Sequence, residues 1–202
     1  MTPLAKIQAL FDRSIEVKQR TRDEHLEILP VMAGLCADAV AKGGKILLCG
    51  NGGSAADAQH LAAELLIRLR PDINRGGISA IPLALDSSSM TACANDYSFD
   101  RVFARMVESL GRPGDVLLAI TTSGKSANIL RTLETARAMK IATLGFLGGD
   151  GGPARALCDR AFIVPSRETG RIQEVHITAG HALMELIEDD LLARGAIKRV
   201  DG

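Results

Sequence analysis

Residues 115–139 read DVLLAITTSGKSANILRTLETARAM and contain, in order, an apolar run, a hydroxyl-rich loop and a helical stretch. The run at 115–120 is almost continuously apolar, which is typical of a strand buried on both faces of a sheet. A helix is predicted over 126–139. A strand that leads through a short loop into a helix is the repeating unit of a parallel sheet covered by helices.

The same alternation continues on both sides of this unit. Further strands are predicted at 45–49, 78–83, 141–146 and 161–164, and further helices at 54–69, 99–110 and 171–194. These segments predict an α/β fold, a doubly wound, parallel sheet of about five strands flanked by helices.

Upstream of the first strand, apolar residues such as Ile7 and Phe11 recur at three- and four-residue steps and predict two helices, with Pro30 in the first turn of the second or at a bend before it. We expect one domain over 1–202, with a helical appendage at 1–42 and an α/β sandwich core at 43–202. One small sheet cannot bury both sides of two extra helices. Their surplus apolar face is therefore expected to pack against a second copy of the chain.

Composition excludes several classes of partner. The 202 residues are 47% hydrophobic, and Lys+Arg and Asp+Glu number 24 each and are scattered, so no general field attracts nucleic acid or an anionic membrane. Aromatic residues make up only 3%, too few for a base-stacking platform. We expect no nucleic-acid partner and no membrane partner.

The N-terminus lacks the pattern of a signal peptide, and no apolar run approaches the roughly 18 residues of a membrane span. The four cysteines have no metal-type spacing and lie in or beside apolar runs, as reduced core thiols do. The expected compartment is the cytoplasm.

Two loops follow predicted strands and lead into helices, which is where open α/β sheets bind ligands. The first is GNGGS at 50–54, whose glycines let the backbone approach a ligand closely. Ser54 could cap the following helix, whose N-terminal amides would then face an anion. The loop does not match a dinucleotide fingerprint, and a plain glycine turn is the alternative.

The second loop is TTSGKS at 121–126, with four hydroxyls in six residues. Hydroxyls and free amides can bind a phosphate dianion, and the helix that starts near Ser126 adds the positive end of its dipole. The spacing of a nucleotide P-loop is missing, so nucleotide hydrolysis is disfavoured. An over-supplied helix cap is the alternative.

Titratable side chains occur in two of the predicted helices. His60 and Glu64 are four residues apart and share one helix face. They could bind a divalent metal, act as a base beside an acid, or simply form an exposed pair. The last helix carries Gln173, His176 and His181 among apolar neighbours, where a histidine is more often a core residue than a ligand.

Five motifs occur in one order along the chain. They are GNGGS at 50–54, AADAQH at 55–60 with Glu64 four residues on, AND at 94–96, GDVLLAITTSGKSAN at 114–128, and RIQEVHI at 171–177 with His181 four residues on. Together they resemble the phosphoheptose isomerase branch of the sugar isomerase (SIS) superfamily. The resemblance covers almost the whole chain, and the ordered set is far more specific than any one motif.

The resemblance implies an aldose-ketose isomerase that interconverts sedoheptulose 7-phosphate and D-glycero-D-manno-heptose 7-phosphate, the first step towards activated heptoses for surface polysaccharide. It also implies a homotetramer and one zinc per site. The zinc ligands that it implies are His60, Glu64, Gln173 and His181. The substrate contacts that we expect are Asn51, Gly52, Gly53, Ser54, Glu64, Asn95, Asp96, Thr121, Thr122, Ser123, Ser126 and Gln173.

The isomerisation moves a proton between two neighbouring carbons through an enediol. Glu64 is the candidate base at carbon, and His181 is the candidate acid and base at oxygen. Zinc held by the same residues would stabilise the enediolate, but a residue that binds metal cannot at the same time be a free base.

One helix also separates Gln173 and His181 by about 12 Å along its axis, so one ion cannot reach both. Either the helix begins after Gln173, or the two side chains come from different subunits that share an active site.

Two positions depart from the family pattern. Gly170 stands where some relatives carry Asp, and Thr121 replaces a common serine but keeps a hydroxyl. Two rival functions remain. One is a non-catalytic binding module of the same fold that associates with a replication initiator, although such relatives typically lack the acids and histidines that this chain retains. The other is isomerisation of a different phosphosugar.

Overall fold

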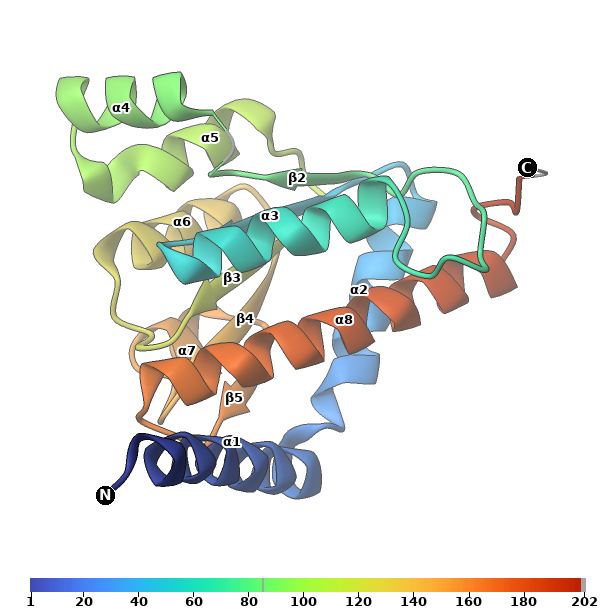
Figure 1. Ribbon diagram of the computed structural model, residues 1–202. Helices are drawn as coiled ribbons and strands as arrows, with labels where there is room; N and C mark the ends of the chain where they lie inside the picture. Colours follow the sequence, from blue (N-terminus) through green and yellow to red (C-terminus); the bar gives the residue numbers. More distant parts are fainter. Residues whose placement is uncertain (85, 201–202) are drawn as a thin grey trace.

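The computed structural model describes residues 1–84 and 86–200 and contains one five-stranded sheet between two layers of helices (Figure 1). All neighbouring strands are parallel, in the order β2-β1-β3-β4-β5. The strands are β1 (Ile46–Gly50), β2 (Ala80–Pro82), β3 (Val116–Thr121), β4 (Ala142–Gly148) and β5 (Arg160–Val164). The predicted α/β class and the five-stranded parallel sheet are confirmed.

The central strands are the ones with the most continuous apolar runs. Every residue of β1 and β3 is buried, because helices cover both faces of the sheet at these positions. The edge strand β2 is shorter than the predicted 78–83 and ends at Pro82, which has no amide to donate to a ladder.

The helices form two apolar layers, one on each face of the sheet. On one face α2, α3 and α8 contribute to one core cluster, and on the other α5, α6 and α7 contribute to a second. The helices are α1 (Pro3–His25), α2 (Ile28–Ala41), α3 (Gly53–Leu66), α4 (Ser87–Asp96), the 3-10 turn η1 (Phe99–Arg101), α5 (Val102–Leu110), α6 (Ala127–Ala138), α7 (Ala154–Leu157) and α8 (Thr169–Ala193).

The two N-terminal helices differ in how they pack. Six residues of α2, among them Met32 and Cys36, are buried in the core beside α8, whereas α1 buries only Thr21. The appendage expected over 1–42 is therefore limited to α1, because α2 is a layer helix of the sandwich. Pro30 is the third residue of α2, in the first turn, where its missing amide breaks no helical hydrogen bond.

Two helices were not predicted from the sequence, the single turn α7 and the longer α4. None of the residues of α4 is buried, so no apolar periodicity marks it. Its start is stabilised locally, because the carboxylate of Asp86 accepts hydrogen bonds from the amides of Ser88 and Ser89 (2.9 and 3.1 Å). Within the described residues, none of the helices is long and apolar enough to span a membrane.

Candidate functional site

The two predicted ligand loops lie side by side at the point where the strand order reverses. From β1 the chain goes to β2 on one side of β1 and then returns to β3 on the other side. The loops after β1 and β3 are therefore neighbours, and they lead into α3 and α6 on opposite faces of the sheet. Side chains join them: Asn51 Nδ2 donates to Asn128 Oδ1 at 2.9 Å, and Asn128 Nδ2 donates to Asn51 Oδ1 at 2.8 Å. The side chain of Asn51, an expected sugar contact, is thus engaged within the chain.

The hydroxyl loop at 121–126 is a tight turn between β3 and α6. Thr121 is buried, and its Oγ1 accepts a hydrogen bond from the amide of Gly124 (3.3 Å), while Ser123 Oγ accepts one from the amide of Lys125 (3.2 Å). Ser126 is the N-cap of α6, as predicted, but among the described residues its hydroxyl makes no capping bond. The Ser126 hydroxyl can therefore turn to a ligand.

Gly124 explains how this loop keeps its shape. Its φ is +63°, and a Cβ there would lie 1.9 Å from the carbonyl oxygen of Gly151. Only glycine satisfies both the left-handed backbone and this close approach. The hydroxyl loop is thus packed directly against the loop that follows β4.

The glycine loop at 50–54 differs from the prediction in one respect. Gly52, with φ +55°, is the N-cap of α3, and Ser54 lies inside the first turn with a nearly buried side chain. The amide of Ser54 donates to the carbonyl of Asn51 (3.0 Å). The predicted capping role of Ser54 is wrong, because the turn closes through its own backbone.

A cavity of about 410 Å³ lies beside the hydroxyl loop. It is lined by Thr122, Ser123, Lys125, Gly148, Gly149, Asp150, Ser166, Arg167, Thr169 and Ile172. Two of its side chains, Lys125 and Arg167, are cationic and suit an anion. The amide of Gly152 holds the pKa of the Asp150 carboxyl below its usual value, and the two cations act in the same direction.

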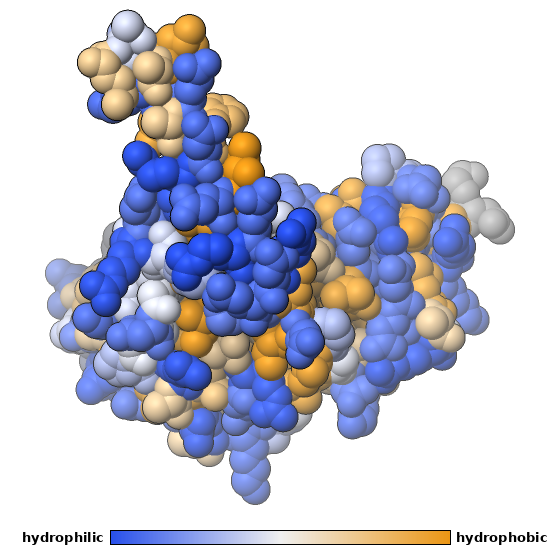
Figure 2. Space-filling model, turned by 90° about the horizontal axis from the view of Figure 1, so that it is seen from below, coloured by the Kyte–Doolittle hydropathy of each residue, from blue (hydrophilic) through white to orange (hydrophobic). Residues whose placement is uncertain are grey.

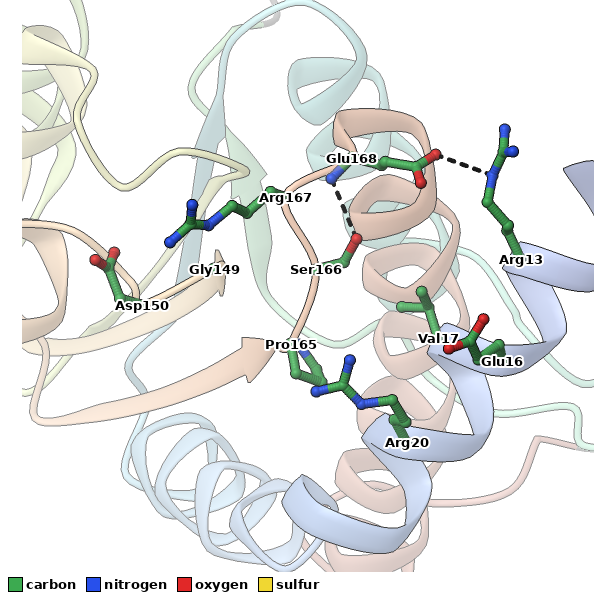
Figure 3. A pocket seen from close by; sticks show the side chains of 10 residues that line it. All are labelled: Arg13, Glu16, Val17, Arg20, Gly149, Asp150, Pro165, Ser166, Arg167 and Glu168. Atoms are coloured by element: carbon green, nitrogen blue, oxygen red, sulfur yellow. Dashed lines mark hydrogen bonds and ion pairs between the residues drawn. The ribbon is translucent and has the colours of Figure 1, made fainter.

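A larger cavity of about 570 Å³ adjoins the first, between α1 and the segment that joins β5 to α8 (Figure 3). Arg13 and Arg20 reach it from α1, and Arg13 Nε lies 3.4 Å from a carboxylate oxygen of Glu168. Its arginines are matched by Glu16, Asp150 and Glu168. The smaller cavity suits an anion better, because it borders the hydroxyls and contains more cations than acids.

His60, Glu64 and His181 form a cluster between α3 and α8. The Nε2 atoms of His60 and His181 are 2.8 Å apart, and Glu64 Oε1 lies 3.3 Å from His60 Nε2. One ligand atom from each of the three residues lies within 4.8 Å of the others. Two imidazoles and a carboxylate with open remaining positions are the donor set of a catalytic zinc site, so these residues fit a divalent metal.

Gln173 does not join this cluster within one chain. It lies inside α8, which begins at Thr169, so the alternative that the helix starts after Gln173 is excluded. Gln173 and His181 are separated by about 12 Å along the axis of α8. The Gln173 amide lies over Gly53 instead, where an added Cβ would be 1.7 Å from Gln173 Nε2.

Asn95 and Asp96 also lie elsewhere. They form the exposed end of α4, which contacts η1 and α5, and Asn95 Nδ2 donates to Asp96 Oδ1 at 2.9 Å. The structure does not bring these two expected sugar contacts to the His60 cluster of the same chain.

The prediction missed two polar residues beside the site. Asp57 is half-buried, and its Oδ2 has no hydrogen-bond partner among the described residues. Burial raises the pKa of Asp57, and the nearby His60 and His181 oppose that rise. Its three-residue spacing from His60 on one helix face was the available signal. Asn128 was part of a quoted motif, but nothing local indicated its partner.

Comparison with known proteins supports one family. The SIS domain family matches residues 10–148. The chain is 50% identical to the phosphoheptose isomerase of Chlorobaculum parvum over 176 residues, which cover 87% of this chain and 84% of that one. The chain belongs to the phosphoheptose isomerase family. A family member from Aquifex aeolicus is 46% identical over 191 residues, 95% of this chain and 99% of that one.

Solved structures agree with this assignment. The phosphoheptose isomerase of Neisseria gonorrhoeae superposes with a TM-score of 0.88 at 40% identity, covering 93% of this chain and all of that one. That of Francisella tularensis gives a TM-score of 0.90 at 36% identity, over 94% of this chain and all of that one. The resemblance to phosphoheptose isomerases and the expectation of a sugar-phosphate isomerase are confirmed.

Proposed function

We propose that this phosphoheptose isomerase family member interconverts sedoheptulose 7-phosphate and D-glycero-D-manno-heptose 7-phosphate, the first step of activated heptose synthesis for surface polysaccharide. The observation that carries the proposal is the cluster of His60, Glu64 and His181 in a chain with this family membership. A carboxylate beside two imidazoles supplies the proton-transfer groups that an enediol mechanism needs.

The phosphate end of the substrate is assigned to the hydroxyl loop. Thr122, Ser123 and Ser126 offer hydroxyls at the N-terminus of α6, whose dipole favours an anion. Lys125 and Arg167 add positive charge from two sides of the cavity. With the phosphate held there, the sugar carbons extend along α3 and α8.

The chemistry is assigned to Glu64 and His181. Glu64 takes the proton from one carbon and returns it to its neighbour, and His181 moves the matching proton between the two oxygens. Zinc held by His60, Glu64 and His181 would supply a Lewis acid for the oxygen that becomes negative in the enediolate. A side chain cannot bind metal and act as a free base at once. Removal of the metal therefore tests whether Glu64 and His181 act as metal ligands or as free acid and base groups.

The active unit is proposed to be a homotetramer with sites shared between subunits. Gln173, Asn95 and Asp96 lie away from the cluster of their own chain, so a neighbouring copy would deliver them. The exposed stripe on α1 supplies an interface: Leu4, Ile7, Phe11 and Ile15 recur at three- and four-residue steps and are all more than half exposed. Figure 2 looks onto this side of the molecule and shows apolar patches among polar ones.

We also assign the reaction to the cytoplasm. The four cysteines are all unpaired in the structure, and two of them, Cys36 and Cys49, are buried in the core. Unpaired core thiols are typical of a reducing compartment.

One assay tests the function. The protein is incubated with sedoheptulose 7-phosphate, with and without a chelator, and the experiment is repeated with Glu64→Gln. The variant should turn over about two to four orders of magnitude more slowly, because the carbon-bound base is lost. Turnover like that of wild type would remove Glu64 from the mechanism. A folded wild type that turns over only another phosphosugar, or none, would favour one of the two rival functions.

A further inference from the structure

A buried ion pair joins the end of α3 to α8, well below the surface. The guanidinium of Arg75, in the segment between α3 and β2, donates to the carboxylate of Glu188 on α8, and the two side chains are 0% and 1% exposed. Arg70 also donates to Glu188, at 2.7 Å. These contacts connect segments that are 113 residues apart in the sequence.

Arg75 also donates from both Nη atoms to the backbone of the helix that carries the candidate base, and Nη1 donates in addition to the carbonyl of Gly76 at 3.0 Å. Arg75 Nη2 donates to the carbonyl of Glu64 at 2.8 Å, and Nη1 donates to that of Leu65 at 2.8 Å. These carbonyls belong to the last turn of α3, where helical partners run out. Arg75 therefore binds the main chain of Glu64 and the side chain of Glu188 with one rigid planar group.

Glu188 lies seven residues beyond His181, which is two helical turns and thus the same face of α8. Hydrogen bonds thus connect Glu64 to Arg75 and Arg75 to Glu188, and helix α8 connects Glu188 to His181. A slip of one residue between the helices would move one of them by about 1.5 Å along its axis and separate the ligand atoms of the cluster.

The helices are also in close contact next to the cluster. Gly180, adjacent to His181, is packed so tightly on α3 that a Cβ there would lie 2.7 Å from both Cδ atoms of Leu61. Leu61 in turn follows His60 directly. Close packing alone sets the distance between the helices, whereas sliding along the axis is opposed by the directional bonds of Arg75.

We propose that Arg75 and Glu188 are positioning residues that fix the register of α3 against α8 and so hold His60 and Glu64 opposite His181. A buried ion pair is weak support for stability, because desolvation offsets most of its attraction. Its value here lies in the geometry of the cluster. The inference rests on the proposed metal-binding role of that cluster.

The test replaces the pair by apolar residues of similar size, Arg75→Met with Glu188→Leu. Such replacements of buried ion pairs are often tolerated by the fold. Zinc is titrated calorimetrically into the metal-free proteins, a readout that needs no turnover. We expect the dissociation constant for zinc to rise by about 10- to 100-fold, the usual effect of losing a residue that orients metal ligands.

Two further variants separate positioning from folding. Lys45→Met removes the ammonium partner of buried Asp115 (2.7 Å), beside the first residues of β1 and β3, and it should lower the unfolding temperature while leaving zinc affinity unchanged. Arg75→Lys keeps a charge for Glu188 but lacks the planar fork. It should fold normally and bind zinc with intermediate affinity. Its kcat should fall by a larger factor than its KM changes.

Wild-type zinc affinity in the folded double variant or in Arg75→Lys would overturn the inference. A wild-type chain that binds no zinc would overturn it too, because there would be no ligand geometry to hold. Wild type that binds zinc but does not turn over sedoheptulose 7-phosphate would refute the proposed function alone, and the zinc titrations would still decide the positioning role.

Discussion

Asn51 and Asn128 exchange two side-chain hydrogen bonds, at 2.9 and 2.8 Å, across the switch point of the sheet. Each amide uses both a donor and an acceptor, so the glycine loop after β1 is held against the first turn of α6. The two halves of the ligand site therefore move as one body. This contact fixes the position of the start of α6 relative to the glycine loop that leads into α3.

Asn128→Ala should disturb substrate binding without touching the reacting groups. It leaves the amide of Asn51 unpaired, and Asn128 is 2% exposed, so we expect a loss of about 1–3 kcal/mol in stability. KM should rise more than kcat falls, because the loops lose their mutual alignment. Steady-state kinetics and denaturant unfolding measure both effects. Thr135→Ala, at a partly exposed position of the same helix, is the control, and equal kinetics for the two variants would contradict the prediction.

Gly124→Ala should open the phosphate loop. The new Cβ would meet the carbonyl oxygen of Gly151 at 1.9 Å, and backbone rather than a flexible side chain must then move. We expect weaker inhibition by inorganic phosphate and a higher KM. Gly114→Ala is a matched control, because its φ of +92° carries a similar backbone strain but nothing lies within 4 Å. If both variants bound phosphate equally, the contact with Gly151 would have no part in shaping the loop.

His176 should make the fold sensitive to acid. It is fully buried, its Nε2 lies 3.1 Å from the carbonyl oxygen of Leu147, and burial lowers its pKa to about 4 against 6.5 in the unfolded chain. Between these values the unfolded chain binds a proton that the native chain does not. The contribution of neutral His176 to the unfolding free energy is therefore fully present above pH 6.5. It is lost as the pH falls towards 4, by up to on the order of 3 kcal/mol.

Denaturant unfolding of wild type and His176→Gln between pH 7 and pH 4.5 measures this contribution. The difference in unfolding free energy between the two proteins should shift in favour of the variant as the pH falls. A constant difference over that range would show that His176 does not titrate differently in the two states.

Phe11→Asp should dissociate the proposed tetramer. Phe11 is 68% exposed in the centre of the α1 stripe, and a charge there could not be buried between copies without a large penalty. Light scattering should give the mass of a smaller assembly, and turnover should fall because Gln173, Asn95 and Asp96 would no longer reach a neighbour. Lys6→Asp, exposed on α1 away from the face of the stripe, should keep the wild-type mass. A full-size assembly for Phe11→Asp would place the interface elsewhere.

The sequence by itself determined the strands and the two loops that follow β1 and β3. Residues 116–120 are apolar without interruption, and burial on both faces of a sheet imposes that pattern locally. The hydroxyl loop and the glycine loop could also be predicted from the sequence, because turn residues and strand ends are encoded within a few residues. Helix α4 could not be predicted from the sequence, because none of its residues is buried and so no apolar periodicity marks it.

Only the tertiary structure showed how the side chains meet, although the family resemblance had implied that His60, Glu64 and His181 share a metal. His60 and His181 are 121 residues apart, and Asn51 and Asn128 are 77 apart. A periodic pattern reports which face of an element is buried, but it contains nothing about the element packed against that face. The register of α3 on α8, and with it the cluster, depends on the close approach at Gly180 and on the bonds of Arg75, which exist only once both helices lie on the sheet.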